Sequence, residues 1–445
     1  MSDDRSINEN GLWDPFGSLG PIRSRTIWFV IALVLSIHSG ARFIRNVLYP
    51  MPTSGQNEIF VPDFFQDYAS ARNYHEKLPV YTDHNITAML YLDTRLKGGD
   101  EYFSFKVNAH PPSSILIFLP FGKLDFYRAY AIWNLFGMIL FVVSIILLLR
   151  ELNVKANIWI ISPMVVAILA GNTVCEVVRL GQLGFILLFL FVLIWIADRS
   201  RMWTTAGFLL AIAISIKLFP AFLMIYFAAK RRWSALISCL VSIVAIASVT
   251  AMIFGISTYR EYFINVFPRF YWFKNAWFNV SISGYFGRLL DAAPSIERHF
   301  FITEPLFYSP TTAYILSSFF SMITISIYLY SSMFCETGNN KDLSFGLSLI
   351  VMILVSPIAW DHYLVILTIP IIQAFVMINK NRSLCKLILI CVFILWCISP
   401  SILSSPFIGL YDAATPILSA TVLSTHFYVL YLLYITFLVK FYYHT

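Results

Sequence analysis

Residues 203–229, WTTAGFLLAIAISIKLFPAFLMIYFAA, form a long apolar stretch that carries Lys217 near its middle. Basic residues border the stretch on both sides, at 199–201 and at 230–232. Because Lys and Arg mark the cytoplasmic ends of membrane segments, both ends are expected on the cytoplasmic side. A single crossing cannot achieve this, so the sequence predicts two short helices that meet near Lys217 and bend at Pro220. One long tilted helix is the alternative.

The composition of the whole chain is that of a membrane protein. Of its 445 residues, 58% are hydrophobic and 12% are charged, whereas a soluble domain carries about 25% charged residues. These values exclude an ordinary soluble enzyme and a disordered or fibrous protein. The net charge of +7 does not indicate nucleic acid as a partner, because membrane proteins gather basic residues on their cytoplasmic loops.

Apolar runs of spanning or near-spanning length predict an all-α polytopic membrane protein. A helix needs about 17–25 residues to cross the hydrocarbon core. With residues 203–229 counted as two helices, we expect about 12 transmembrane helices and both chain ends in the cytoplasm. The other runs lie roughly at 27–49, 127–149, 156–171, 183–198, 233–255, 311–333, 343–357, 361–378, 384–401 and 419–439.

The segments between these runs predict the domain organisation. Residues 1–26 are polar and form a cytoplasmic tail, and residues 27–445 form one integral membrane domain. The long segments 50–126 and 256–310 are predicted outer loops, the first of them amphipathic and lying along the membrane face. Within it, PSSILIFLPF at 112–121 is too short to span, so we expect a re-entrant or interfacial piece.

Polar and ionisable residues in or beside the spans are candidates for function, because their placement in a membrane is costly. They gather at the predicted outer ends of the spans, so a site in this protein is expected to face away from the cytoplasm. The candidates are Asp63, Asp67, His110, Arg179, Gln182, Lys217, Asn279, Arg288 and His362.

Two aspartates lie in VPDFFQDYASARNY at 61–74. Their spacing of four places Asp63 and Asp67 on one face of a helix. Either carboxylate could act as a general base that takes a proton from an attacking hydroxyl. The alternative is a helix N-cap followed by a solvated face.

Three cations could form a phosphate clamp, since Arg179, Lys217 and Arg288 each present donors and positive charge to an anion. Contact with lipid headgroups is the alternative for each of them. Lys217 fits that alternative least well, because apolar runs flank it on both sides.

Two histidines stand in motifs with structural alternatives. His362 follows Trp360 and Asp361 at a helix start, where it could hydrogen-bond a phosphate or sugar hydroxyl or belong to a helix cap. His110 precedes two prolines, which by themselves favour a rigid turn. The sequence shows no metal-ligand cluster with suitable spacing, so no metal or other cofactor is expected.

An ordered set of motifs resembles glycosyltransferase family 87, integral-membrane sugar transferases of the GT-C superfamily. The set covers about residues 25–380, in the order and spacing of the family. Its members are DFFQDYASA at Asp63, LPVYT at 78–82, NAHPPSSILIFLPFGKL at 108–124, GQLGFILL at 181–188, AGFLLAIAISIKLFPAF at 206–222, NVSISGYFGR at 279–288 and SPIAWDHY at 356–363.

The resemblance implies a GT-C fold and a sugar transfer on the extracytoplasmic side of the cell membrane. The sugar donors of that family are polyprenyl-phosphate sugars, of which the mannose donor is the best known. Asp63 matches the family's general base, whereas Asp67 and His110 stand where other residues are common. Lys217 and His362 match the lysine and the histidine of the family's motifs.

The chemistry of such a transfer needs one base. The departing polyprenyl phosphate is stable without a proton, so direct displacement with inversion needs no second carboxylate, in contrast to glycoside hydrolysis. Nearby cations stabilise the charge that develops on the phosphate. We therefore expect a hexosyltransferase, with mannose as the sugar, acting on a lipid- or glycan-linked acceptor. A transporter or flippase, or a polysaccharide polymerase, is the alternative.

Overall fold

The computed structural model describes residues 58–59, 61–93, 95–96, 107–153, 171–276, 278–291, 302–333, 339–377 and 413–442, with isolated positions between 26 and 41. The predicted tail at 1–26 and the predicted spans at 27–49, 156–171 and 384–401 lie outside the described residues, apart from a few single positions.

The described residues are helical, as the sequence predicts. The α-helices are α2 (Phe64–His75), α3 (His84–Leu92), α4 (Pro112–Phe118), α5 (Phe126–Glu151), α7 (Asn172–Leu180), α8 (Gly184–Arg199), α9 (Trp203–Ile216), α10 (Leu223–Ala229), α11 (Trp233–Phe254), α12 (Ile256–Glu261), α13 (Ile282–Leu290), α14 (Pro310–Met333), α15 (Asn339–Val355), α16 (Thr368–Met377), α19 (Pro416–Ala420) and α20 (Thr425–Tyr442).

Shorter elements complete the fold. A π-helical turn at Tyr262–Val266 follows α12. The 3₁₀ helices are Phe121–Lys123, Phe219–Phe222, Phe267–Phe273, Asp361–Leu367 and Val422–Ser424. Four two-residue strands form two parallel pairs, β1 (Glu58–Ile59) with β2 (Arg95–Leu96) and β3 (Ile302–Thr303) with β4 (Ala413–Ala414).

Long apolar helices identify the chain as a membrane protein. Within the described residues, four helical segments are long and apolar enough to cross a membrane, namely α5, α11, 310–332 in α14, and 416–439 across α19 and α20. The bent pair of α7 and α8 would make a fifth. The predicted runs at 343–357 and 361–378 correspond to apolar helices shorter than this length. The total of about twelve spans is not confirmed.

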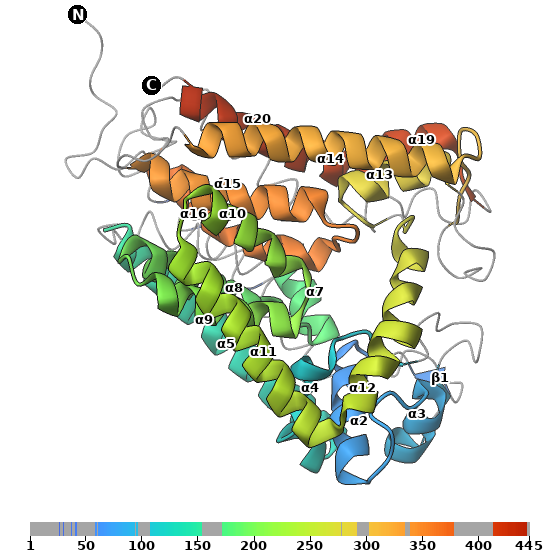
Figure 1. The fold of residues 1–445 in the computed structure, drawn as a ribbon. Coiled ribbons are helices and arrows are strands. Elements are labelled where there is room, and N and C mark those ends of the chain that lie inside the picture. The colour runs from blue at the N-terminus through green and yellow to red at the C-terminus, as the bar shows by residue number, and fades with distance from the viewer. Residues whose placement is uncertain are drawn as a thin grey trace, which may run out of the picture.

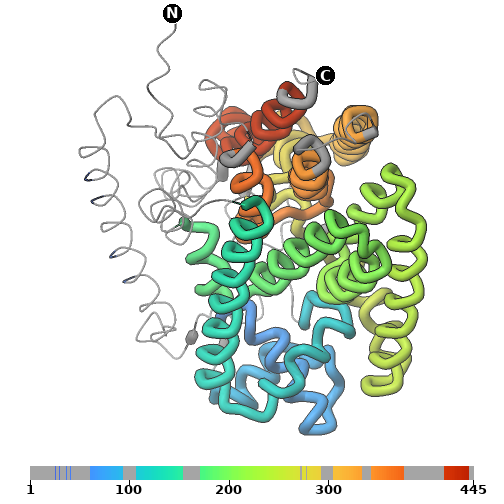
Figure 2. The backbone as a smooth tube through the Cα atoms, turned by 90° about the vertical axis from the view of Figure 1, so that its left-hand side faces the viewer, coloured from blue at the N-terminus to red at the C-terminus, as the bar shows by residue number. Residues whose placement is uncertain are grey.

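The helices form two layers (Figure 1). Helices α5, α8, α9 and α11 pack side by side in one layer, and α14, α15 and α20 pack together in the other. In Figure 2 the segment 61–93, which contains α2 and α3, lies at one end of α5, far from α20. Helix α12 and the turns after it run between the α2–α4 region and α13.

Residues 203–229 are two helices, as predicted, and not one tilted helix. Helix α9 ends at Ile216, and Lys217 is extended, with φ −143° and ψ 145°. The chain then returns through α10. The contacts at its end show this, since the Tyr226 hydroxyl donates to Asp198 Oδ2 at 2.9 Å and Arg232 pairs with the same carboxylate. Both ends of the hairpin therefore lie beside Asp198, and Lys217 lies at its tip.

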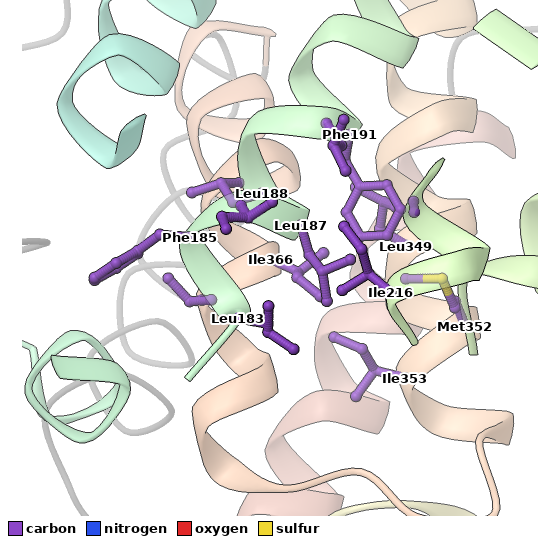
Figure 3. Packing of buried hydrophobic residues seen from close by; sticks show 14 of the residues in the cluster. Leu183, Phe185, Leu187, Leu188, Phe191, Ile216, Leu349, Met352, Ile353 and Ile366 are labelled. Carbon is purple, nitrogen blue, oxygen red and sulfur yellow. The ribbon is translucent and has the colours of Figure 1, made fainter. Parts of the chain in front are cut away.

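The centre of the molecule is a close-packed apolar core around α8. Figure 3 shows Leu187 and Phe191 of α8 packed among Ile216 of α9, Leu349 of α15 and Ile366 of the 3₁₀ helix. These side chains are almost completely buried, at most 2% exposed. Because large buried aliphatic side chains leave few voids, this packing fixes the C-terminal end of α9, where Lys217 follows.

The predicted re-entrant piece at 112–121 begins with the short helix α4. Ile115 and Phe118 of this helix are fully buried within the protein. Ser113 Oγ donates to the Ser215 carbonyl oxygen at 2.6 Å, so α4 begins beside the tip of the α9 hairpin. The polypeptide before α4 is thereby held close to Lys217.

Candidate active site

Asp63 stands at the start of α2, and packing of that helix fixes its position. Phe64, the next residue, is fully buried among the rings of Phe118, Phe126 and Trp133. Asp63 itself is half-buried and its side chain makes no capping hydrogen bond. Asp63 therefore occupies the N-cap position of α2, but its side chain does not cap the helix. Instead, Asp63 Oδ2 accepts a hydrogen bond from Gln182 Nε2 at 2.5 Å.

Gln182 lies in the sharp turn between α7 and α8, whose axes differ by 117°. Gly181 ends α7 with φ +62°, a conformation that favours glycine. A Cβ at Gly181 would lie 2.6 Å from the Cβ of Phe64, so the turn packs directly on α2. Trp133 Nε1 also donates to the Gly181 carbonyl oxygen at 2.8 Å. These contacts place Gln182 beside Asp63.

Lys217 joins this pair from the tip of the hairpin. Its Nζ donates to Gln182 Oε1 at 3.0 Å and to the Tyr363 hydroxyl at 3.3 Å, and lies 4.5 Å from the centre of the Tyr363 ring. The side chain is buried, 6% exposed. Among the described residues, no carboxylate lies within ion-pair distance of Nζ, although the charges of Asp63 and Asp67 reach it electrostatically. Lys217 is thus a buried cation whose direct partners are neutral.

His362 adds an unsatisfied polar group next to Lys217. Its ring is buried and interacts electrostatically with Lys217 and Asp63. Nε2 has no hydrogen-bond partner among the described residues. Nδ1 lies 3.7 Å from Asp361 Oδ1. Since a buried polar atom without a partner is unfavourable, Nε2 is available to a ligand.

Asp67, the second aspartate of the motif, is buried and hydrogen-bonded through its carboxylate. Asp67 is 2% exposed, and both its carboxylate oxygens lie 2.9 Å from His110 Nδ1. Asn108 Nδ2 donates to Asp67 Oδ1 at 3.1 Å. The Tyr81 hydroxyl donates to the His110 carbonyl oxygen at 2.8 Å, and burial raises the pKa of Tyr81, so this donor keeps its proton. The Asp67–His110 pair therefore holds the loop before α4 on α2.

Arg179 lies beside the site but shares its charge with a neighbour. Its Nε and Nη2 donate to Glu176 Oε2 at 2.9 and 2.6 Å. It also interacts electrostatically with Asp63 and Asp361. Arg179 therefore contributes positive charge near Asp63 while its guanidinium is held on α7.

Asn279 and Arg288 hold backbone rather than joining the Lys217 group. Asn279 donates to the carbonyl oxygens of Lys274 and Pro357 and accepts from the N–H groups of Ser281 and Ala359. Arg288 is fully buried and donates to the carbonyl oxygens of Ala276 and Asn279 and to Ser424 Oγ. Both side chains fasten the polypeptide that leads to His362, and no hydrogen bond among the described residues joins them to Asp63 or Lys217.

Sequence reasoning did not single out Tyr363. Its ring stacks on Phe219, with centroids 4.9 Å apart and planes at 19°, and its hydroxyl accepts from Lys217. The signal was its position next to His362 in the motif SPIAWDHY. Asn108, which donates to Asp67, was likewise within a quoted motif but not chosen.

The arrangement combines a half-buried carboxylate, a buried ammonium and an imidazole nitrogen without a partner among the described residues. A carboxylate of this kind can accept a proton, and the ammonium and imidazole can bind an anion. Within the described segments, no group of three or more His, Cys, Asp or Glu residues is placed to hold a metal ion.

Comparison with known proteins identifies the class of the chain. The sequence model of glycosyltransferase family 87 matches residues 108–357, more than half of the protein, including Gln182, Lys217 and Arg288. No curated protein and no solved structure matches the chain. The match confirms the family that the motifs resemble, and with it a membrane glycosyltransferase that uses a sugar donor and an acceptor. The chain belongs to glycosyltransferase family 87.

Proposed function

We propose that this glycosyltransferase moves a hexose, mannose, from a polyprenyl-phosphate donor to a hydroxyl of a lipid- or glycan-linked acceptor. The observation that carries the proposal is Lys217, a buried ammonium beside Asp63 whose direct partners among the described residues are neutral. Burying an unpaired charge costs several kcal/mol, and a bound anion would offset that cost. A sugar phosphate on a lipid carrier supplies such an anion at the depth of the membrane surface.

Asp63 is the proposed general base. It is half-buried, and among the described residues its carboxylate accepts a side-chain hydrogen bond from Gln182 alone, whereas Asp67 is bound by His110 and Asn108. The acceptor hydroxyl would attack the anomeric carbon while the bond from that carbon to the phosphate oxygen breaks. Asp63 takes the hydroxyl proton, the bonding electrons leave with the polyprenyl phosphate, and the configuration at the anomeric carbon inverts.

Lys217, the Tyr363 hydroxyl and His362 Nε2 are the proposed phosphate ligands. Positive charge here stabilises the phosphate as the leaving group gains charge. Arg179 adds a more distant positive charge. We further propose a GT-C fold in which residues 27–445 form one domain of about twelve spans in the cell membrane. The site then faces the extracytoplasmic side, between the outer segments 50–126 and 256–310.

The test is transfer by purified protein in lipid vesicles, with labelled polyprenyl-phosphate mannose and a lipid extract as acceptor. Asp63→Asn should lower the transfer rate by at least roughly 100-fold, because a positioned base contributes on the order of 10²–10⁴. Asp125→Asn is the matched control, since Asp125 is exposed at the start of α5 and should retain transfer.

The possible outcomes separate the parts of the proposal. Full activity of Asp63→Asn would exclude Asp63 as the base. Transfer from another polyprenyl-phosphate sugar, but not from the mannose donor, would overturn only the assignment of mannose as the transferred sugar. Transfer that requires a nucleotide sugar would overturn the lipid-phosphate donor.

A further inference from the structure

We propose that Gln182 is a positioning residue that separates two opposite charges, the Asp63 carboxylate and the Lys217 ammonium. Its amide lies between them and prevents their direct pairing. Asp63 thereby stays available to accept a proton, and Lys217 stays available to bind a phosphate. The separation itself is inferred from the contacts of these three residues, and its catalytic consequence rests on the proposed function.

The contacts around the amide are directional. Gln182 Nε2 donates to Asp63 Oδ2 at 2.5 Å, and Gln182 Oε1 accepts from Lys217 Nζ at 3.0 Å. A carboxylate can only accept and an ammonium can only donate. The amide therefore satisfies both with its nitrogen toward Asp63 and its oxygen toward Lys217, and the reverse orientation satisfies neither.

The backbone holds Gln182 in this place. Gly181 packs on Phe64 of α2, and its carbonyl oxygen accepts from Trp133. The Gln182 N–H donates to the Val177 carbonyl oxygen at 2.9 Å, which closes the end of α7. The side chain is 7% exposed, so it has little room to turn away. The separation is thus built into the α7–α8 turn.

Removal of the amide would let the two charges meet. Lys217 and Asp63 already attract each other electrostatically across Gln182. In a buried site of low effective dielectric this attraction is strong, and a long lysine side chain can close a gap of one amide group. A carboxylate in direct contact with an ammonium is a weaker base, and the ammonium is then no longer available to bind the phosphate.

A stability cycle tests the separation without any substrate. The variants Asp63→Asn, Lys217→Met and the double variant are made in the full-length protein, with Gln182 present and with Gln182→Ala. Apparent Tm in detergent gives the coupling between Asp63 and Lys217 in each background. We expect the coupling to be larger with Gln182→Ala, because the two charges can then pair directly.

A variant of similar size provides the matched control. Gln182→Leu removes both hydrogen bonds but still fills the space between the charges, so the coupling should not rise above that of the Gln182 background. Gln182→Ser replaces Gln182→Ala if the latter does not yield folded protein. Equal coupling in the Gln182 and small-residue backgrounds would overturn the proposal, as would a rise with Gln182→Leu equal to that with Gln182→Ala.

Transfer kinetics test the consequence for the site. Gln182→Ala should lower kcat and raise the donor KM, and should move the acidic limb of the pH–rate profile to lower pH. Gln182→Leu should lower kcat without that movement of the acidic limb. A residue that only stabilises the fold would change the amount of active protein and leave the profile in place, which would overturn the role in catalysis.

The two experiments distinguish this inference from the proposed function. A larger coupling with Gln182→Ala, together with no sugar transfer by the wild type from any polyprenyl-phosphate donor, would retain the charge separation and overturn the function. Transfer by the wild type with unchanged coupling and an unchanged pH profile in Gln182→Ala would retain the function and overturn the charge separation.

Discussion

Asp63 and Asp67 lie one helical turn apart, and their surroundings decide what each carboxylate can do. Asp67 is buried and receives hydrogen bonds from His110 and Asn108, so its oxygens are occupied. Asp63 is half-buried and is bound by a neutral amide from Gln182. The spacing of four predicted a shared helix face but could not show that the two carboxylates have different partners, because the partners come from other parts of the chain.

Lys217→Met should separate stability from donor binding at the level of one residue. A buried ammonium without a carboxylate in direct contact is costly, so the apolar variant should keep or raise the apparent Tm. Loss of a charge-assisted hydrogen bond should raise the donor KM by roughly tenfold or more, while the acceptor KM changes less. Thermal unfolding in detergent and steady-state transfer kinetics check both effects.

Lys217→Arg is the control for charge, since it keeps the cation but changes its shape. It should retain more donor affinity than Lys217→Met. Equal increases of donor and acceptor KM in Lys217→Met would indicate that the lysine does not bind the donor phosphate.

At the scale of elements, turns that break helices assemble the site. The break at Lys217 was predicted from basic flanks and Pro220, and the structure confirms the hairpin. The break between α7 and α8 was not predicted, although Gly181 stood in a quoted motif. Its 117° bend carries Gln182 to α2, and no local pattern in hydropathy marks such a bend.

Gly181→Ala should disrupt the site through this turn. Alanine at φ +62° is strained by about 1–2 kcal/mol, and its Cβ would lie 2.6 Å from the Cβ of Phe64. The turn must move away from α2, which displaces Gln182 from Asp63. We expect at least a roughly tenfold loss of kcat, since small displacements of a reacting group are costly.

Gly255→Ala is the matched control for backbone strain. Gly255 has φ +85°, but the nearest atom to its Cβ, Ser257 Oγ, lies at 3.4 Å and there is no clash. Alanine is also strained there, because φ +85° with ψ 148° is a region that is essentially restricted to glycine, but Gly255→Ala should retain transfer. Similar kcat values for the two variants would show that the contact of Gly181 with α2 does not matter for activity.

At the scale of the whole molecule, two polar clusters lie at opposite ends of the apolar core. One contains Asp63 and Lys217. The other joins Asp198 to Arg232 and Asp342 to Arg199, where α8, α11 and α15 meet. Helices α11 and α14 are mostly uncovered, because only 11% and 22% of the residues in their most apolar 18-residue stretches are buried. Such surfaces are suited to lipid or to other membrane segments.

Labelling of introduced cysteines should place these two ends on opposite sides of the membrane. Glu76 at the end of α2 and Met202 before α9 are both exposed. A membrane-impermeant maleimide should label Glu76→Cys in intact spheroplasts and Met202→Cys after the membrane is opened, because basic flanks mark the cytoplasmic side. Labelling of the wild-type protein measures the background signal from its native cysteines. The opposite pattern would place the site in the cytoplasm.

The sequence by itself determined the helical membrane class, the hairpin with Lys217 at its tip, the family and the pool of candidate residues. These follow from hydropathy, charge and motif order, which are local properties of the chain. Only the tertiary structure decided which candidates meet. Gln182 binds Asp63 across 119 residues of sequence and Lys217 across 35, whereas Asn279 and Arg288 hold backbone instead. The physical reason is that a side chain's hydrogen-bond partners depend on which helices pack together, and neither periodicity nor composition specifies that packing.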